Sequence, residues 1–134
     1  MPQKIALGYK ELMKAAEAET EQVTAEEAMA IAGRDDVVIV DIRDIRELER
    51  DGRIPGSYHA PRGMLEFWVD PECPYHKPIF AEDKTFIIHC ASGWRSLLAT
   101  QTLQRMGLRP VKNLAGGLSG WKAAGGPVEK VQSK

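Results

Sequence analysis

Two cysteines are the residues of this chain best suited to covalent chemistry, and one of them, Cys90, lies between a predicted strand and a predicted helix. Cys90 follows the apolar run Phe86–Ile88 and directly precedes the short polar loop Ala91–Gly93, after which residues 95–106 have the pattern of a helix. A cysteine between the carboxyl end of a strand and the amino end of a helix lies where α/β folds place their chemistry. Amide N–H groups there lack intrahelical partners and carry partial positive charge, which favours a thiolate. Cys90 is therefore the candidate nucleophile.

The residues after Cys90 are suited to holding an anion. Gly93 permits the backbone angles that a curled loop requires, and Arg95 adds a permanent charge at the rim, suited to an oxyanion. If the loop curls around the sulfur atom, its N–H groups form an anion-binding nest. The alternative is a buried structural cysteine without reactivity. We expect the substrate-binding loop to comprise Ala91, Ser92, Gly93, Trp94, Arg95 and Ser96.

The spacing between Cys90 and Arg95 separates two kinds of anion chemistry. Cysteine-dependent phosphatases place five residues between the cysteine and the phosphate-binding arginine, whereas here only four residues intervene and Ser96 stands where the arginine would be. The smaller loop fits one extra sulfur atom on Cys90 better than a tetrahedral phosphate. A small phosphatase or arsenate reductase that uses the same thiolate remains an alternative. A sulfur-carrier or binding module without turnover is the other.

Alternating elements must position this loop. Strands are expected at residues 37–40, 57–59, 86–88 and 111–114, and they alternate with helices expected near residues 24–31, 44–48, 62–69, 95–106 and 118–124. The pair Thr24 and Glu27 has the spacing of a capping box that opens a helix, and Asp44 with Glu47 can cap the next one. This alternation predicts an α/β fold, with a central parallel sheet of about five strands covered by helices on both faces.

Four motifs in order resemble those of the single-domain rhodanese-like sulfurtransferases. The stretch "CASGWRS" resembles the family's Cys-Arg-x-Gly-x-Arg-Ser loop, and "DIR", residues 41–43, matches its Asp-x-Arg. "GRIPGS", residues 52–57, resembles its Gly-His-Ile-Pro-Gly-Ala turn, and "LAGGLSGW", residues 114–121, resembles its closing Gly-Gly-x-x-x-Trp. The resemblance covers about residues 21–126. "HAPRGMLEFW", residues 59–68, is more loosely similar to the polysulfide-sulfurtransferase branch.

The resemblance implies a three-layer rhodanese-like fold and a two-step reaction without a metal or an organic cofactor. The Cys90 thiolate would take a sulfur atom from a donor, polysulfide or thiosulfate, to form a persulfide. A thiophilic acceptor, such as a thiol or a sulfur carrier, would then remove it. One departure matters: Ala91 stands where many members carry arginine. Because a sulfonate donor loses one cation there, we expect thiosulfate to be a poorer donor than polysulfide.

Several other polar residues are expected to support the site. Asp41 and Arg43 lie at a strand's carboxyl end and are expected to face the same crevice. By the resemblance they brace the active-site region, and direct contact with the substrate is the alternative. His59 and Arg62 are expected near the pocket mouth. His89 should point to the opposite face of the strand from Cys90 and is interpreted as a hydrogen-bonded core residue. Cys73 lies in a proline-rich loop and is interpreted as an incidental cysteine rather than a resolving thiol.

The bulk properties exclude several classes of partner. The formal net charge is −1, with 18 basic and 19 acidic side chains, so nothing favours nucleic acid or an anionic membrane. No apolar run approaches the ~20 residues of a membrane span. Neither Cys-x-x-Cys nor metal-ligand histidine spacing occurs, so we expect no metal, and reduced thiols in the cytoplasm.

The expected domain organisation has three parts. Residues 1–20 would form an N-terminal helical extension, with a helix over residues 5–19, and residues 21–128 the rhodanese-like domain. Residues 129–134 would form a C-terminal tail. The extension could cover a sheet edge or form the contact of a homodimer.

Overall fold

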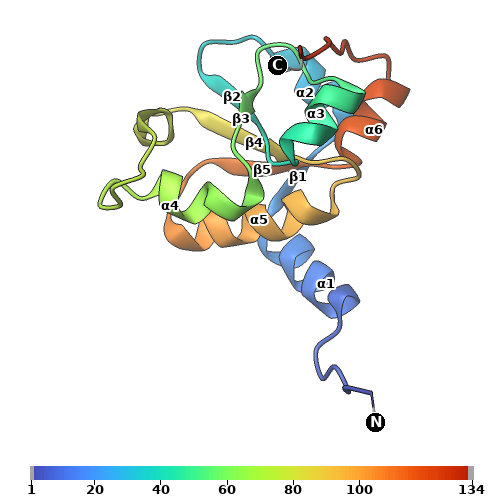
Figure 1. The fold of residues 1–134 in the computed structure, drawn as a ribbon, viewed down its shortest axis with the longest axis vertical. Coiled ribbons are helices and arrows are strands. Elements are labelled where there is room, and N and C mark those ends of the chain that lie inside the picture. Colours follow the sequence, from blue (N-terminus) through green and yellow to red (C-terminus); the bar gives the residue numbers. More distant parts are fainter. Residues whose placement is uncertain (1, 133–134) are drawn as a thin grey trace.

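A five-stranded sheet lies at the centre of the computed structural model, which describes residues 2–132 (Figure 1). Its strands are β1 (Glu21–Val23), β2 (Val37–Asp41), β3 (Tyr58–His59), β4 (Thr85–His89) and β5 (Val111–Leu114). They lie in the order β1-β5-β4-β2-β3, and every neighbouring pair is parallel. The predicted parallel sheet is therefore confirmed, and all its carboxyl ends meet at one edge.

Helices cover both faces of this sheet. They are α1 (Tyr9–Glu19), α2 (Ala25–Ile31), α3 (Ile45–Asp51), α4 (Leu65–Val69), α5 (Trp94–Met106) and α6 (Gly117–Ala123), with short 3₁₀ turns η1 (Arg62–Met64) and η2 (Pro78–Ala81). Figure 1 shows α2, α3 and α6 on one side of the sheet and α4 and α5 on the other. The predicted three-layer α/β fold is confirmed.

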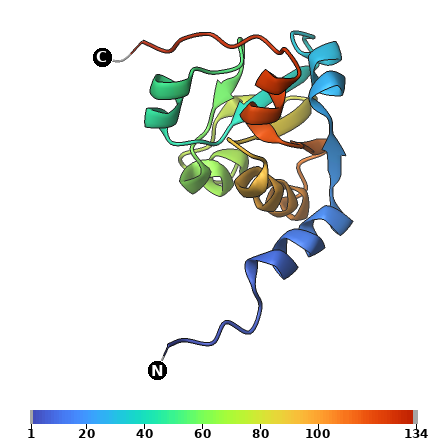
Figure 2. The same cartoon turned by 90° about the vertical axis from the view of Figure 1, so that its right-hand side faces the viewer.

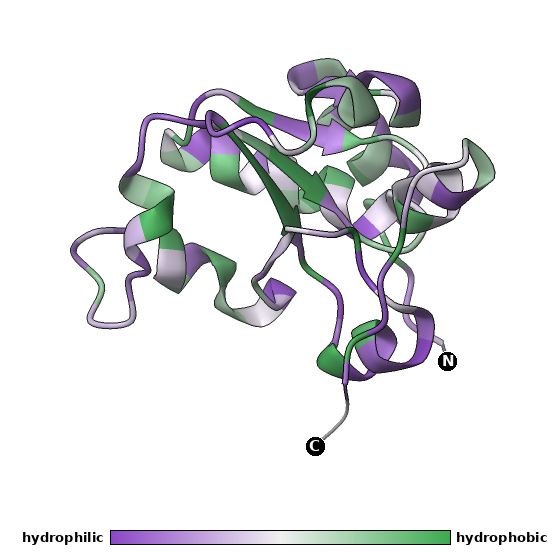
Figure 3. Cartoon of the chain, turned by 90° about the horizontal axis from the view of Figure 1, so that it is seen from above, coloured by the Kyte–Doolittle hydropathy of each residue, from purple (hydrophilic) through white to green (hydrophobic). Residues whose placement is uncertain are grey.

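Two hydrophobic clusters fill the spaces between the layers. Because side chains alternate along a strand, Ile88 of β4 packs with Leu103 of α5 on one face, while Ile87 packs with Trp121 of α6 on the other. The strands at the centre are among the most hydrophobic segments of the chain (Figure 3). Cys90 belongs to the α5 side of the sheet, which leaves its loop to run across the carboxyl edge.

Local sequence signals explain where several helices begin. Thr24 Oγ1 accepts a hydrogen bond from the Glu27 amide while the Glu27 carboxylate accepts one from the Thr24 amide, so the predicted capping box is present. Asp44 and Glu47 cap α3 in the same way. In contrast to these helices, the strand β1 was not predicted. Glu21 and Gln22 are exposed polar residues and only Val23 is buried, so the segment lacks the apolar run that would indicate a strand.

Helix α1 lies outside the three layers. It packs along α5, with Ala16 as its buried residue and with a hydrogen bond from Gln101 Nε2 to Glu19 Oε2 at 2.9 Å. The helix expected over residues 5–19 begins only at Tyr9, because Gly8 caps it and donates its amide to the Glu11 carboxylate at 2.8 Å. Figure 2 shows the preceding segment extending away from the body of the molecule.

The chain after α6 returns to the domain. Arg53 and Glu129 exchange backbone hydrogen bonds of 2.9 Å in an antiparallel bridge. The expected tail, residues 129–134, thus begins with a bound residue, and residues 133 and 134 lie outside the described part. The domain boundaries expected after residues 20 and 128 stay predictions. Among residues 2–132, no helix combines the length and the apolar content that a membrane crossing needs.

Candidate active site

The Cys90 sulfur atom lies at the centre of a ring of hydrogen-bond donors. Its side chain is buried, and Sγ accepts hydrogen bonds from the Gly93 amide at 3.2 Å and the Ser96 amide at 3.4 Å. The Ser96 hydroxyl lies 3.4 Å away and donates to a thiolate. The amide nest expected from the sequence therefore surrounds this atom.

Glycine at position 93 allows the loop to close on the sulfur. Gly93 has a φ of 98°, a conformation that residues with a side chain rarely adopt, and it forms the N-cap of α5. The first turn of α5 then directs its free amides inward, towards Sγ. The helix begins at Trp94, one residue before the predicted start.

This geometry lowers the pKa of the Cys90 thiol despite its burial. Burial by itself raises the pKa of the Cys90 thiol. The hydrogen bonds from the Ser96 hydroxyl and amide and from the Gly93 amide, with the charge of Arg95, outweigh it, so the pKa of Cys90 lies below its ordinary value. The site thus favours the thiolate, which is the nucleophilic form of cysteine.

Arg95 lies at the rim of the Cys90 loop, where its guanidinium is paired with a carboxylate. Its Nη1 and Nη2 atoms donate to the two carboxylate oxygens of Glu47 at 2.8 and 3.0 Å. Glu47 comes from α3, on the other side of the sheet, so this two-fold ion pair spans the carboxyl edge beside Cys90. The sequence identified Glu47 only as a helix-capping residue, since its second role depends on how α3 packs.

Trp94 projects from the same turn onto the surface. Its ring stacks on that of Tyr9 in α1, with centroids 5.6 Å apart and an interplanar angle of 26°. Both side chains remain 55% exposed. The N-terminal helix therefore reaches the rim of the Cys90 loop, a contact that the sequence did not predict.

A second loop supports the first from behind. The amides of Leu118 and Ser119 donate to the carbonyl oxygens of Cys90 and Ala91 at 2.8 and 3.0 Å. A Cβ atom at Gly117 would lie 2.6 Å from the Cys90 carbonyl oxygen. No residue with a side chain fits at position 117 without displacing the Cys90 loop.

Buried charges lie on the opposite face of the sheet from Cys90. Arg43 Nη2 donates to Asp41 Oδ2 at 2.7 Å, and its second contact is the Gly52 carbonyl oxygen at 2.8 Å. His89 Nδ1 lies 3.1 Å from the Cys90 carbonyl oxygen and therefore donates to it. Burial lowers the pKa of His89 below its ordinary value and outweighs the Asp41 charge and the hydrogen bond to Cys90, which raise it, so the neutral ring is favoured. His89 thus holds the backbone at Cys90, and within residues 2–132 none of these three side chains has a hydrogen bond to the sulfur.

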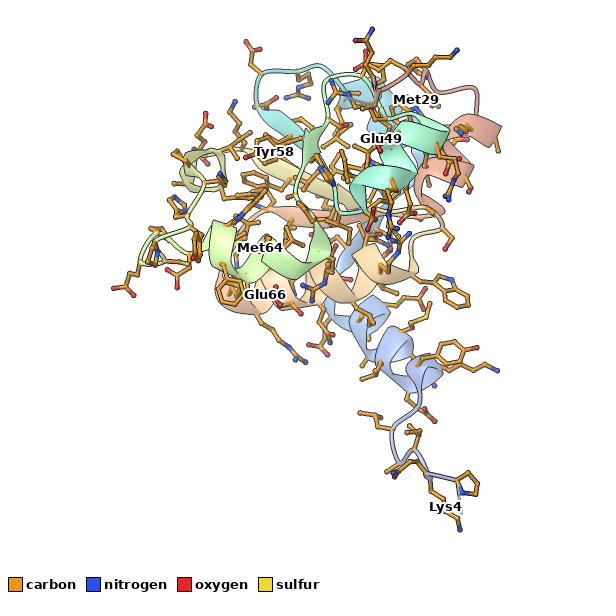
Figure 4. The ribbon with its side chains drawn as sticks, in the orientation of Figure 1. Lys4, Met29, Glu49, Tyr58, Met64 and Glu66 are labelled. Atoms are coloured by element: carbon orange, nitrogen blue, oxygen red, sulfur yellow. The ribbon has the colours of Figure 1, made fainter. Side chains whose placement is uncertain are left out.

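His59 and Arg62 are engaged in local contacts. His59 Nε2 lies 2.7 Å from the Arg43 carbonyl oxygen, and Arg62 Nη1 lies 2.8 Å from Glu66 Oε1. Figure 4 labels Glu66 at helix α4. Neither side chain has a hydrogen bond to the Cys90 loop within residues 2–132. Their role at the mouth stays a prediction.

Other features of the molecule are separate from this site. A hollow of about 390 Å³ lies at the far end of β2, between Gly33 and Tyr58, and includes no residue of the Cys90 loop. Cys73 is a partly exposed free thiol in the loop before η2. Within residues 2–132, no three His, Cys, Asp or Glu side chains gather as a metal site would require.

Comparison with known proteins places this arrangement in a family. Residues 24–124, most of the chain, match the rhodanese-like domain. The chain belongs to this family. The match includes the Asp41–Arg43 motif, the Cys90 loop and the bracing glycines, so the geometry described above is that of a rhodanese-like domain.

Three relatives illustrate the range of this rhodanese-like family. A sulfurtransferase of Allochromatium vinosum is 32% identical over 98 residues, 73% of this chain and 83% of that protein. The solution structure of the polysulfide-sulfur transferase homodimer of Wolinella succinogenes is 26% identical with a TM-score of 0.69, covering 92% of this chain and 88% of the other. A Rhodopseudomonas palustris protein of unknown function, described as a possible tyrosine phosphatase, is 55% identical with a TM-score of 0.93, covering 96% and 99%.

Proposed function

We propose that this rhodanese-like protein is a sulfurtransferase that carries sulfane sulfur as a persulfide on Cys90. The Cys90 thiolate attacks the terminal sulfur of a donor, and a new S–S bond forms as the donor's S–S bond breaks. The leaving group departs with the bonding electron pair. A thiophilic acceptor then attacks the outer sulfur, takes it, and returns the thiolate.

One observation carries this proposal: the ring formed by two amides and a hydroxyl around Sγ. It stabilises a thiolate before the reaction, and its positive dipoles favour the negative charge of a persulfide after the first step. The sulfurtransferase relatives support the same chemistry.

The preferred donor is a polysulfide or a persulfide rather than thiosulfate. A sulfonate group needs cations at the rim, where this chain has Ala91 in place of an arginine. Arg95 is bound at both nitrogen atoms by Glu47. A donor without a sulfonate group does not need the cations that are missing.

Substitution of the nucleophile tests the proposal. Cys90→Ser should abolish sulfur transfer to cyanide while the circular-dichroism spectrum and melting temperature stay close to those of the wild type. Intact-mass spectrometry should show one added sulfur, about 32 Da, on the wild type after incubation with polysulfide, and its removal by cyanide. Full activity of the Cys90→Ser variant would refute the role of this residue.

A phosphatase activity is the second candidate, because the Rhodopseudomonas palustris relative is described as a possible tyrosine phosphatase. Here the loop is one residue shorter than a phosphatase loop. Ser96, which stands where a phosphatase has its arginine, supplies two of the three hydrogen bonds to the sulfur atom. Hydrolysis of an aryl phosphate that disappears in Cys90→Ser would favour this candidate. An added sulfur without multiple turnovers would instead indicate a sulfur carrier.

We extend the proposal to a cytoplasmic homodimer. Both cysteines are free thiols, as expected in a reducing compartment. The similar polysulfide-sulfur transferase of Wolinella succinogenes is a homodimer, and the similarity covers 92% of this chain.

A further inference from the structure

A surface groove runs between helix α1 and the first turn of α5, beside the Cys90 loop. Its volume is about 280 Å³, and its lining residues are Tyr9, Lys10, Met13, Lys14, Glu17 and Trp94. We call it the α1 groove. Trp94 belongs both to this groove and to the catalytic loop, so whatever occupies the groove borders the entrance to Cys90.

Exposed apolar residues line the groove and precede it along the chain. Tyr9 and Trp94 stack on each other yet each remains 55% exposed, and Leu12 is 40% exposed. Before the helix, Ile5 and Leu7 are 76% and 58% exposed on a segment that extends away from the body (Figure 2). Exposed apolar patches mark interaction sites in soluble domains, and the Tyr9–Trp94 pair forms such a patch at the groove.

The charges along the groove identify the occupant. Lys10 and Lys14 lie on the amino-terminal side of its lining and Glu17 on the carboxyl-terminal side. Within residues 2–132, these three side chains form no ion pair with the rest of the chain. Lys10 near one end and Glu17 near the other are complementary to the ends of the same helix running in the opposite direction, while Lys14 lies between them.

We propose that the α1 groove binds α1 of a second copy of this chain, in an antiparallel pair with two-fold symmetry. With the axis near Met13 and Lys14, Lys10 of each copy faces Glu17 of the other, and the contact is the same on both sides. Tyr9, Met13 and Trp94 of both copies are then covered. An unrelated partner would have no reason to match this order of charges.

This pairing makes the homodimer part of the active-site entrance. Each Trp94 becomes a wall between the Cys90 loop and the second copy, so donors and acceptors must approach from the side of the loop away from α1. The inference rests on the proposed homodimer and is independent of the sulfur chemistry, because the charge pattern lies outside the Cys90 ring.

Charge reversal tests the pairing. Lys10→Glu and Glu17→Lys should each weaken the dimer by about tenfold or more, because each places two like-charge pairs in the contact. The double variant K10E/E17K restores opposite charges and should dimerise as the wild type does. Mixing the two single variants should also give a heterodimer, since both pairs become complementary. Light scattering after size-exclusion chromatography, over a range of concentrations, measures all four cases.

Matched controls and the possible outcomes keep the test decisive. Lys130→Glu and Glu72→Lys make the same charge changes at exposed positions away from α1 and should leave the dimer unchanged. A dimeric wild type whose single variants remain dimeric would overturn the α1 groove as the contact and leave the homodimer standing. A wild type that stays monomeric at high concentration would overturn both, and would point to a different protein as the occupant. Sulfur transfer by the variants is measured separately and reports on the proposed reaction alone.

Discussion

The reactivity of Cys90 is decided by a few atoms within hydrogen-bond distance. Its side chain is almost fully buried, and burial alone would keep the thiol protonated. Three donors and a nearby guanidinium reverse that preference. Two of the donors belong to Ser96, so this residue, rather than the more conspicuous Arg95, contributes most directly to the charge on sulfur.

Removing the Ser96 hydroxyl should therefore raise the pKa of Cys90. In Ser96→Ala, the curve of iodoacetamide alkylation rate against pH should move to higher pH, with a rate at pH 6 lower by roughly tenfold, since one hydrogen bond to a charged atom contributes about 1.5 kcal/mol. Thr102→Val, which removes a hydroxyl further along the same helix, serves as the matched control. Superimposable curves for Ser96→Ala and the wild type would show that the hydroxyl does not stabilise the thiolate.

Glu47 should control how the protein selects its donor. In Glu47→Gln the carboxylate that holds Arg95 is lost, so the guanidinium becomes available to a sulfonate. We expect kcat/KM for thiosulfate to rise by about tenfold relative to that for polysulfide, because one charge-assisted pair at the rim is released. Glu49→Gln, on the same helix, is the control. A constant ratio of the two donors in Glu47→Gln would contradict this role.

At the scale of elements, the Cys90 loop depends on the segment that joins β5 to α6. Gly117 has a φ of 57° and brings its backbone against the carbonyl oxygens of Cys90 and Ala91. Two amides of that segment donate to those same oxygens. The shape of the Cys90 loop is therefore imposed by a glycine that lies more than twenty residues further along the chain.

Gly117→Ala should separate steric contact from backbone strain. We expect it to lower sulfur transfer at least tenfold and to destabilise the fold by about 2 kcal/mol or more, because the new Cβ atom meets backbone. Gly125→Ala has a comparable positive φ of 86° but no atom within 4 Å of the new Cβ, so it reports strain alone. Urea unfolding and cyanide-coupled turnover of both variants measure the difference. Equal losses of activity and stability in the two variants would show that steric contact at position 117 has no separate effect.

The sequence predicts the elements more fully than the contacts between them. Apolar runs and capping residues placed β2, β4 and β5 and the start of α2, because those signals are local. β1 escaped prediction because two of its three residues are polar and exposed at the edge of the sheet. The Arg95–Glu47 ion pair and the Tyr9–Trp94 stack were not predicted from the sequence either. Each joins elements that are brought together only by tertiary packing.

At the scale of the whole molecule, a buried polar layer connects the sheet to the end of α3 and to the Cys90 loop. Asp41, Arg43 and His89 are all fully buried, and Asp41 Oδ2 lies 2.7 Å from Arg43 Nη2 and 3.6 Å from His89 Nε2. Burial raises the pKa of Asp41, but its hydrogen bonds to Arg43 and the nearby charges lower it below its ordinary value. Breaking such a buried pair costs about 3–5 kcal/mol, because it leaves one charge without a partner. The stability of the whole domain therefore depends on the ionisation of this layer.

His89 should make the domain less stable in mild acid. Because burial depresses its pKa in the folded state, the ring stays neutral there, whereas in the unfolded chain it binds a proton below about pH 6.5. The unfolded state then binds more protons, so the free energy of unfolding should fall as the pH drops below 6.5. The slope should be at most about 1.4 kcal/mol per pH unit, the limit for one proton. Asp41, whose folded pKa is also depressed, adds a further loss only below about pH 4.

His89→Gln isolates this contribution, because glutamine can still donate a hydrogen bond to the Cys90 carbonyl oxygen but does not titrate. The variant should be less stable than the wild type at pH 7.5, and its free energy of unfolding should change less between pH 6.5 and 5. Urea unfolding at half-unit steps of pH gives both curves. Curves that stay parallel over this interval would show that His89 does not couple acid to unfolding. In that case the acid sensitivity of the domain would have to come from carboxyl groups alone, at lower pH.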